Sequence, residues 1–104
     1  MSEKRLFERA PFDDEVDVEV DGRTFRARVH DLSVGGLYVR SSERLPFGQT
    51  VRIHIRLPAL PERRVLGGIV RWNREDGFGV QLGPTGALDT FALAEFVARK
   101  NQRL

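Results

Sequence analysis

The sequence predicts an all-β fold that ends in one helix: six short antiparallel strands that form a small closed barrel or a sandwich, followed by a C-terminal α-helix. Three observations predict it. Apolar and polar residues alternate with a period of two over much of the chain up to residue 82. Glycine and proline interrupt these runs at hairpin spacing. After Gly83-Pro84 the period lengthens to that of a helix.

The first hairpin is predicted at Asp21-Gly22, a dipeptide typical of two-residue β-turns. Residues 1–10 are charged, lack a long apolar face, and indicate an arm or a short helix that ends at Pro11. The strand that leads into the turn alternates valine with acidic residues and has Val16, Val18 and Val20 on one face. The strand after it has Phe25, Ala27 and Val29 on one face and Arg26, Arg28 and His30 on the other.

Four further strands follow, separated by polar, glycine-rich or proline-rich segments. The third covers residues 37–40, and residues 41–48 form a loop. The fourth covers residues 51–57 and points Val51, Ile53, Ile55 and Leu57 inward. The fifth, residues 64–72, is bent by Gly67-Gly68. A turn at Asp76-Gly77 leads to the sixth, which has Phe78, Val80 and Leu82 on one face.

The helix is predicted from Ala87 to about Lys100. Its apolar stripe consists of Leu88, Phe91, Ala92 and Phe96, with Leu93 and Val97 beside it. Arg99 and Lys100 in the last turn suit the negative end of the helix dipole. A stripe of this kind has to be buried, either across the barrel or against a partner.

The composition is that of one globular domain and argues against several classes of protein. The chain has 104 residues, no cysteine, and a formal net charge of +2 from 17 basic and 15 acidic residues. So small an excess does not point to a nucleic-acid polymer as partner, and disulfides and thiolate sites are excluded. No apolar run approaches the roughly 18 residues of a membrane helix, and no signal peptide is evident. We therefore expect a cytoplasmic protein without membrane insertion.

Catalytic chemistry finds little support in the sequence. His30, Asp31 and Ser33 are the residue types of a hydrolase triad, but neighbours on a strand point to opposite faces, so His30 does not easily reach Ser33. The two imidazoles, His30 and His54, fall on polar strand faces and are expected to be solvated. Gly35-Gly36 opens a strand and lacks the Lys-Ser/Thr of a phosphate loop. We expect no enzyme activity, no metal and no cofactor.

Two short stretches favour ligand binding instead. Arg5 and Arg9 are four residues apart, so they would share a face and could grip a planar anion. Residues 30–40, HDLSVGGLYVR, place a carboxylate, a hydroxyl and two glycines at the mouth of a strand. The purely structural alternatives are a solvated arm and an Asx-turn in which Asp31 accepts from the Ser33 amide.

In this order the two stretches resemble the signature of the PilZ domain family, Arg-x-x-x-Arg followed by Asp/Asn-x-Ser-x-x-Gly. The matching residues are Arg5, Arg9, Asp31, Ser33 and Gly36, with 21 residues between Arg9 and Asp31. The stretch VRWNREDGFGVQL around Trp72 and the closing helix also look like such a domain. The resemblance implies one domain over residues 1–104: an N-terminal ligand-binding arm (1–11), a six-stranded antiparallel β-barrel (12–84) and a C-terminal helix (85–104).

The resemblance also implies a function, that of a receptor for the bacterial second messenger cyclic di-GMP. Arg5 and Arg9 would grip guanine edges or phosphates, and Asp31 would accept hydrogen bonds from guanine N1–H and N2–H₂. Ser33 would bond a phosphate oxygen or fix the loop. The glycines would let the backbone approach the ligand closely; these are Gly35 and Gly36.

Signalling would follow when the arm folds over the ligand and presents a changed surface to an effector protein, which the sequence does not identify. Lys4 precedes the first arginine, a position that in the family influences whether one ligand or a stacked pair binds. Glu8 departs from the pattern because it places a negative charge next to Arg9.

Two alternatives remain at this point. One is a PilZ-like adaptor that binds only protein, in motility or envelope regulation. The other is a small barrel that binds single-stranded nucleic acid, which needs aromatic platforms on an open face. Tyr38 and Trp72 are the candidates for such platforms, because most phenylalanines fall on the predicted core face.

Overall fold

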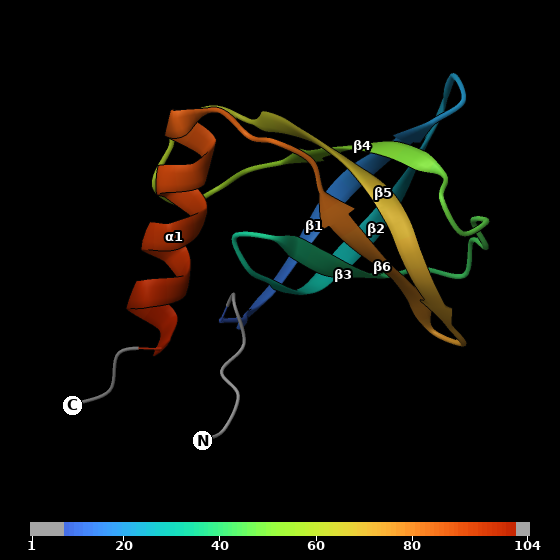
Figure 1. The fold of residues 1–104 in the computed structure, drawn as a ribbon, viewed down its shortest axis with the longest axis horizontal. Helices are drawn as coiled ribbons and strands as arrows, with labels where there is room; N and C mark the ends of the chain where they lie inside the picture. The colour runs from blue at the N-terminus through green and yellow to red at the C-terminus, as the bar shows by residue number, and fades with distance from the viewer. Residues whose placement is uncertain (1–7, 102–104) are drawn as a thin grey trace.

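The computed structural model describes residues 8–101 as six strands and one helix (Figure 1). The strands are β1 (Ala10–Val20), β2 (Arg23–Leu32), β3 (Gly36–Arg40), β4 (Thr50–Ile55), β5 (Arg64–Arg74) and β6 (Gly77–Leu82), and the helix α1 covers Ala87–Asn101. All strands pair antiparallel and close into a barrel in the order β1-β2-β3-β6-β5-β4. The expected fold class is therefore confirmed, and the strands form a barrel rather than a sandwich.

The first hairpin forms at the predicted dipeptide. Asp21 and Gly22 both have positive φ, 49° and 80°, as a type I′ turn requires. β1 is longer than the sequence pattern suggests, because it continues back to Ala10 through a bulge between Pro11 and Asp14. The barrel thus begins at Ala10, two residues before the boundary expected at residue 12.

The β5–β6 hairpin turns one residue earlier than expected. Its turn residues are Glu75 and Asp76, and Gly77 is already paired with Arg74 as the first residue of β6. Gly77 is therefore not a turn glycine. Its lack of a side chain is required because a Cβ there would overlap the backbone carbonyl of Val39 on β3.

The barrel interior is filled by the apolar side chains that alternate along each strand. Completely buried examples are Val16, Val29, Val39, Ile53 and Phe78. The outer face carries ion pairs and polar contacts between neighbouring strands. His54 belongs to them: it is half-buried rather than fully solvated as expected, and its Nε2 lies 3.0 Å from Glu19 Oε1. Within residues 8–101, no helix is both long and apolar enough to cross a membrane.

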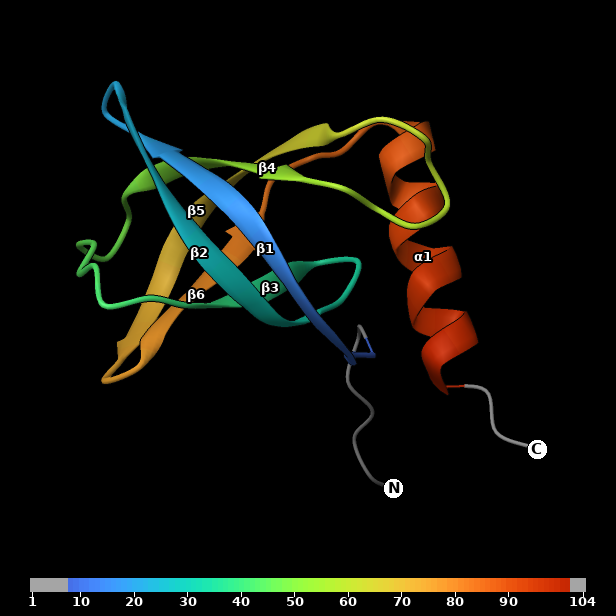
Figure 2. The same cartoon turned by 180° about the vertical axis from the view of Figure 1, so that it is seen from behind.

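Helix α1 packs beside the barrel in contact with β1 (Figure 1, and from behind in Figure 2). Its buried apolar residues are Ala92, Leu93, Phe96 and Val97. Phe96 meets Phe12 of β1 edge to face, with ring centroids 5.2 Å apart. These contacts fix the helix C-terminal half next to the start of β1.

The first turns of α1 differ from the predicted apolar stripe. Leu88 and Phe91 were expected in the buried face but are 51% and 55% exposed. Asp89 is buried instead, because its Oδ1 accepts a hydrogen bond from Arg64 Nε at 2.6 Å. This contact between the helix and the start of β5 turns residues 88 and 91 toward solvent.

Candidate functional site

A bulge in β2 turns Asp31 out of the barrel. Val29 pairs with Val39 of β3 and Asp31 pairs with Tyr38, so His30 is an extra residue between the two pairs. With strict alternation Asp31 would follow Val29 into the core. The extra residue reverses its direction, which is a common use of bulges near sites.

A second bulge, in β5, does the same for Trp72. Val70 pairs with Val80 of β6 and Trp72 pairs with Gly79, which leaves Arg71 as the extra residue. Trp72 is consequently 44% exposed rather than buried behind Val70. The irregularity of β5 thus lies at Arg71 and not at Gly67-Gly68, where the sequence predicted a bend.

The two bulges place their side chains over the same surface. Asp31, Tyr38, Gly79 and Trp72 are successive neighbours in one row across β2, β3, β6 and β5. Gly79 has no side chain, so the Trp72 indole lies against its backbone, where a Cβ would overlap the ring. Asp31, Tyr38 and Trp72 of this row line an open pocket of about 1130 Å³.

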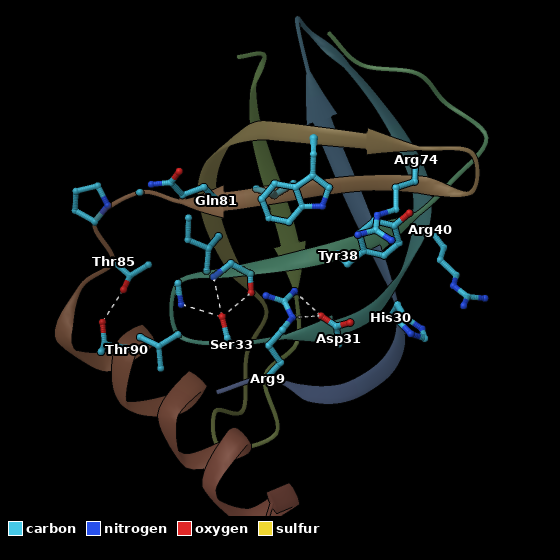
Figure 3. A pocket seen from close by; sticks show the side chains of 18 of the residues that line it. Arg9, His30, Asp31, Ser33, Tyr38, Arg40, Arg74, Gln81, Thr85 and Thr90 are labelled. Atoms are coloured by element: carbon cyan, nitrogen blue, oxygen red, sulfur yellow. Dashed lines mark hydrogen bonds and ion pairs between the residues drawn. The ribbon is translucent and has the colours of Figure 1, made fainter. Parts of the chain in front are cut away.

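The pocket collects most of the residues that the sequence singled out. Its walls come from Arg9 just before β1, the β2–β3 loop, the β5–β6 hairpin and the segment that leads into α1 (Figure 3). Its lining includes Arg9, Asp31, Ser33, Gly35 and Gly36. Lys4 and Arg5 lie outside the described residues.

Arg9 and Asp31 are in direct contact. Arg9 Nε donates to Asp31 Oδ1 at 2.8 Å, and Arg9 Nη2 donates to the same oxygen (Figure 3). Both side chains are partly exposed, at 31% and 25%. The Arg9 carbonyl accepts a hydrogen bond from Asn101 Nδ2 at the end of α1, at 3.3 Å. Arg9 therefore links the pocket to the helix.

Ser33 fixes the loop, one of the two roles expected of it. The residue is only 2% exposed, and its Oγ accepts from the amides of Gly35 and Gly36 at 3.2 and 3.1 Å. The Ser33 amide donates to the Gly36 carbonyl at 2.8 Å, so the alternative Asx-turn with Asp31 does not form. A Cβ at Gly36 would stand 2.5 Å from the Val80 carbonyl oxygen, which explains glycine there.

A second wall is built by β3 and the β5–β6 hairpin. The sequence assigned none of it to the ligand site and suggested binding only for Tyr38 and Trp72, as platforms for a nucleic acid. Tyr38 Oη donates to Asp76 Oδ1 at 2.5 Å, and the Arg74 guanidinium lies 5.9 Å from the Tyr38 ring centroid. Burial, and then the bond to Asp76, raise the pKa of Tyr38 to about 12. The same bond holds the pKa of Asp76 below its ordinary value. Arg40 and His30 also line this wall.

One sequence signal for this wall was present in GFGVQL. Gly77 and Gly79 alternate with buried residues, so both occupy outward positions of β6. Outward glycines in a strand leave room for side chains of the neighbouring strands to lie over them. Here the Trp72 ring of β5 lies over Gly79, whereas Gly77 packs against the Val39 backbone of β3.

The chemistry of the pocket is that of a binding site for a planar, anionic molecule. Three guanidinium groups line it, from Arg9, Arg40 and Arg74, together with two carboxylates and the rings of Tyr38 and Trp72. Guanidinium groups bind phosphates and purine edges, and exposed aromatic rings stack on bases.

Comparison with known proteins agrees with this description. The sequence model of the PilZ domain matches residues 3–98. The chain belongs to the PilZ domain family. The resemblance inferred from the two signature stretches is thereby confirmed, and with it membership of a family of cyclic di-GMP receptors and adaptors. Comparison with curated protein sequences finds no match.

Two solved structures share the fold of this PilZ domain. The Bacillus subtilis inhibitor of motility, MotI/DgrA, superposes with a TM-score of 0.76 and 24% identity over 94% of this chain and 51% of that one. The Borreliella burgdorferi PlzA protein, solved in complex with c-di-GMP, gives 0.70 and 16% over 90% of this chain and 41% of that one. This PilZ domain thus spans about half the length of those chains or less.

Proposed function

We propose that this PilZ domain binds cyclic di-GMP in the pocket and passes the signal on through its N-terminal segment. The observation that carries the proposal is the contact between Arg9 and Asp31, which brings the two halves of the signature together in one pocket. The c-di-GMP complex of PlzA, which shares the fold, supports it.

The Arg9–Asp31 pair suits an exchange of partners. In the free protein the Arg9 guanidinium donates two hydrogen bonds to the Asp31 carboxylate. A guanine offers N1–H and N2–H₂ to the carboxylate, while the freed guanidinium can bind O6 and N7 or a phosphate. A partly exposed ion pair is worth about 0–1 kcal/mol, and each hydrogen bond to a charged group about 1.5–3 kcal/mol. The exchange is therefore favourable.

The second wall supplies the remaining contacts. Trp72 presents an exposed ring that lies against Gly79, ready to stack on a purine. Arg40 and Arg74 form no ion pair within residues 8–101, so their guanidinium groups are available to the ligand's phosphodiesters.

Arg9 also connects ligand binding to a change of surface. Its side chain lies in the pocket while its backbone carbonyl is held by Asn101 of α1. A ligand that draws the Arg9 side chain away from Asp31 moves the segment that leads into β1. Arg5, which precedes it by four residues, would close over the ligand from the same segment.

The test is calorimetric titration with cyclic di-GMP. Wild-type protein should bind at micromolar ligand, and Arg9→Ala should abolish binding while the circular dichroism stays unchanged. Arg26→Ala is a matched control, because Arg26 is also ion-paired to an aspartate, Asp17, on the same hairpin but outside the pocket. Absence of heat with the wild-type protein would reject the proposal.

A second candidate is a PilZ adaptor that binds protein and no nucleotide. The exposed apolar side chains of Leu88 and Phe91 on α1 favour a protein contact. Under this alternative the titration is silent, and Arg9→Ala does not change the capture of a partner protein.

A further inference from the structure

We propose that a second surface of this domain docks a protein partner that presents acidic side chains around an apolar anchor. The arginine–aromatic surface, as we name it, consists of Arg44, Phe47, Arg71, Trp72 and Arg74. All five residues are exposed. They come from the β3–β4 loop and the second half of β5, and Trp72 and Arg74 also form its border with the pocket.

The loop and the strand form one continuous surface. The Gly48 amide donates to the Val70 carbonyl at 2.7 Å, and the Val70 amide donates to the Gln49 carbonyl at 2.9 Å. Further along, Asn73 Nδ2 donates to the Leu45 carbonyl at 2.8 Å. Because the loop is already fixed to β5, a partner would not have to order it on binding.

The arginines of this surface differ from most others on the barrel. Other guanidinium groups are neutralised by carboxylates, for example in the pairs Arg23–Glu43, Arg26–Asp17, Arg28–Asp13, Arg52–Glu19 and Arg63–Asp17, whereas Arg40 and Arg56 also lack an ion pair within residues 8–101. Arg44, Arg71 and Arg74 form no ion pair with any residue from 8 to 101. Arg44 Nη1 donates to the Arg74 carbonyl at 3.0 Å. The three positive charges are not neutralised by a carboxylate of residues 8–101, so they can attract carboxylates from outside.

Aromatic rings provide the apolar part of the surface. Phe47 is 69% exposed, the highest value among the exposed large apolar residues of the described part of the chain. The Arg71 guanidinium covers its ring, 5.5 Å from the centroid. Phe12, Phe25, Phe78 and Phe96 pack in or against the core, so among the phenylalanines of residues 8–101 Phe47 shares its exposure only with Phe91. Arginine and aromatic residues are enriched at the centres of protein–protein interfaces.

Two acidic residues next to this surface distinguish a protein partner from a membrane or a nucleic acid. Glu75 and Asp76 form the tip of the β5–β6 turn, directly after Arg74, and both are exposed. An anionic membrane or a phosphodiester chain is uniformly negative and would meet these carboxylates as well as the arginines. A protein can place its acidic side chains opposite the arginines alone, so charge complementarity favours a protein.

The experiment selects peptides from a random displayed dodecapeptide library on the full chain, without nucleotide. We expect enriched peptides with an acidic excess and an aromatic or leucine residue. In fluorescence polarisation, the double variant Phe47→Ser/Arg71→Glu should bind them at least about tenfold more weakly. Arg99→Glu on α1 makes the same kind of charge change at a distant exposed site and should leave affinity unchanged.

Three results would overturn the proposal. In the first, the enriched peptides carry no acidic excess, and in the second, they bind the double variant as well as the wild type. In the third, vesicles of equal parts phosphatidylcholine and phosphatidylglycerol, or oligothymidine, bind to the wild-type protein but not to the double variant. That result would assign the surface to a membrane or to nucleic acid. Because no cyclic di-GMP is present, all of these outcomes are independent of the cyclic di-GMP titration.

Discussion

The indole of Trp72 lies against the backbone of Gly79, its pairing partner on β6. A Cβ at position 79 would overlap the ring, so Gly79→Ala should push the indole outward and weaken cyclic di-GMP binding. Because the indole is partly exposed and can move, we expect destabilisation near the lower end of the 1–3 kcal/mol (about 1 kcal/mol) typical of overpacking. Trp72 is the one tryptophan of the chain, so its emission spectrum reports the displacement.

The matched control for this change is Gly67→Ala on β5. A Cβ at Gly67 meets nothing within 4 Å, so the substitution adds the same methyl group in open space. Emission that is identical in wild type, Gly79→Ala and Gly67→Ala would show that Gly79 does not position the indole.

Ser33→Ala should loosen the β2–β3 loop. The substitution removes the acceptor of the Gly35 and Gly36 amides in a residue that is 2% exposed. Leaving buried donors unsatisfied costs about 1–3 kcal/mol, which urea unfolding would measure as a lower midpoint. Ser42→Ala, at an exposed serine of the next loop, should change stability by less than about 0.5 kcal/mol. Equal midpoints for the two variants would contradict the structural role of Ser33.

The strands and the first turn were predictable because their signals are local. The alternation of valine with acidic residues before Asp21-Gly22 indicates which face of β1 is buried. The dipeptide itself is typical of turns with positive φ. The signature residues Arg9 and Asp31 could be paired in advance only through the family resemblance. The sequence around each of the two residues contains no signal that their side chains are in contact.

The bulges and the second wall were not predictable in the same way. An extra residue such as His30 or Arg71 interrupts the alternation of buried and exposed positions. In the sequence such an interruption looks like the end of a strand, and only the pairing with the neighbouring strand identifies it as a bulge. Tyr38 and Asp76 meet because β3 pairs with β6, a non-consecutive neighbour in the closed barrel. Contacts of this kind depend on the whole topology.

Tyr38 should titrate with a midpoint of about 12 instead of its ordinary 10.0, because burial and the bond to Asp76 disfavour the phenolate. The pKa is raised on folding, so the stability that Tyr38 contributes is complete below pH 10.0 and is lost as pH rises through about 12. Tyr38 is the one tyrosine, so ultraviolet absorbance of tyrosinate follows it directly.

The Asp76→Ala variant separates the two causes of that shift. Removing the carboxylate should lower the midpoint, but burial, the larger cause, should keep it above 10.0. Circular dichroism along the same titration verifies that the protein stays folded. A wild-type midpoint near 10.0 in the folded state would mean that Tyr38 is neither buried nor bonded to Asp76.

The orientation of α1 can be tested with two leucines that undergo the same substitution. Leu93 is completely buried and Leu88 is 51% exposed, although the sequence placed Leu88 in the apolar stripe itself. Leu93→Ala should lower the free energy of unfolding by about 2–5 kcal/mol, because it leaves a cavity in the core. Leu88→Ala should change it by less than about 0.5 kcal/mol. Urea unfolding compares the two directly. If Leu88→Ala were the more destabilising, the helix would be rotated about its axis, and the Arg64–Asp89 bond would not set its orientation.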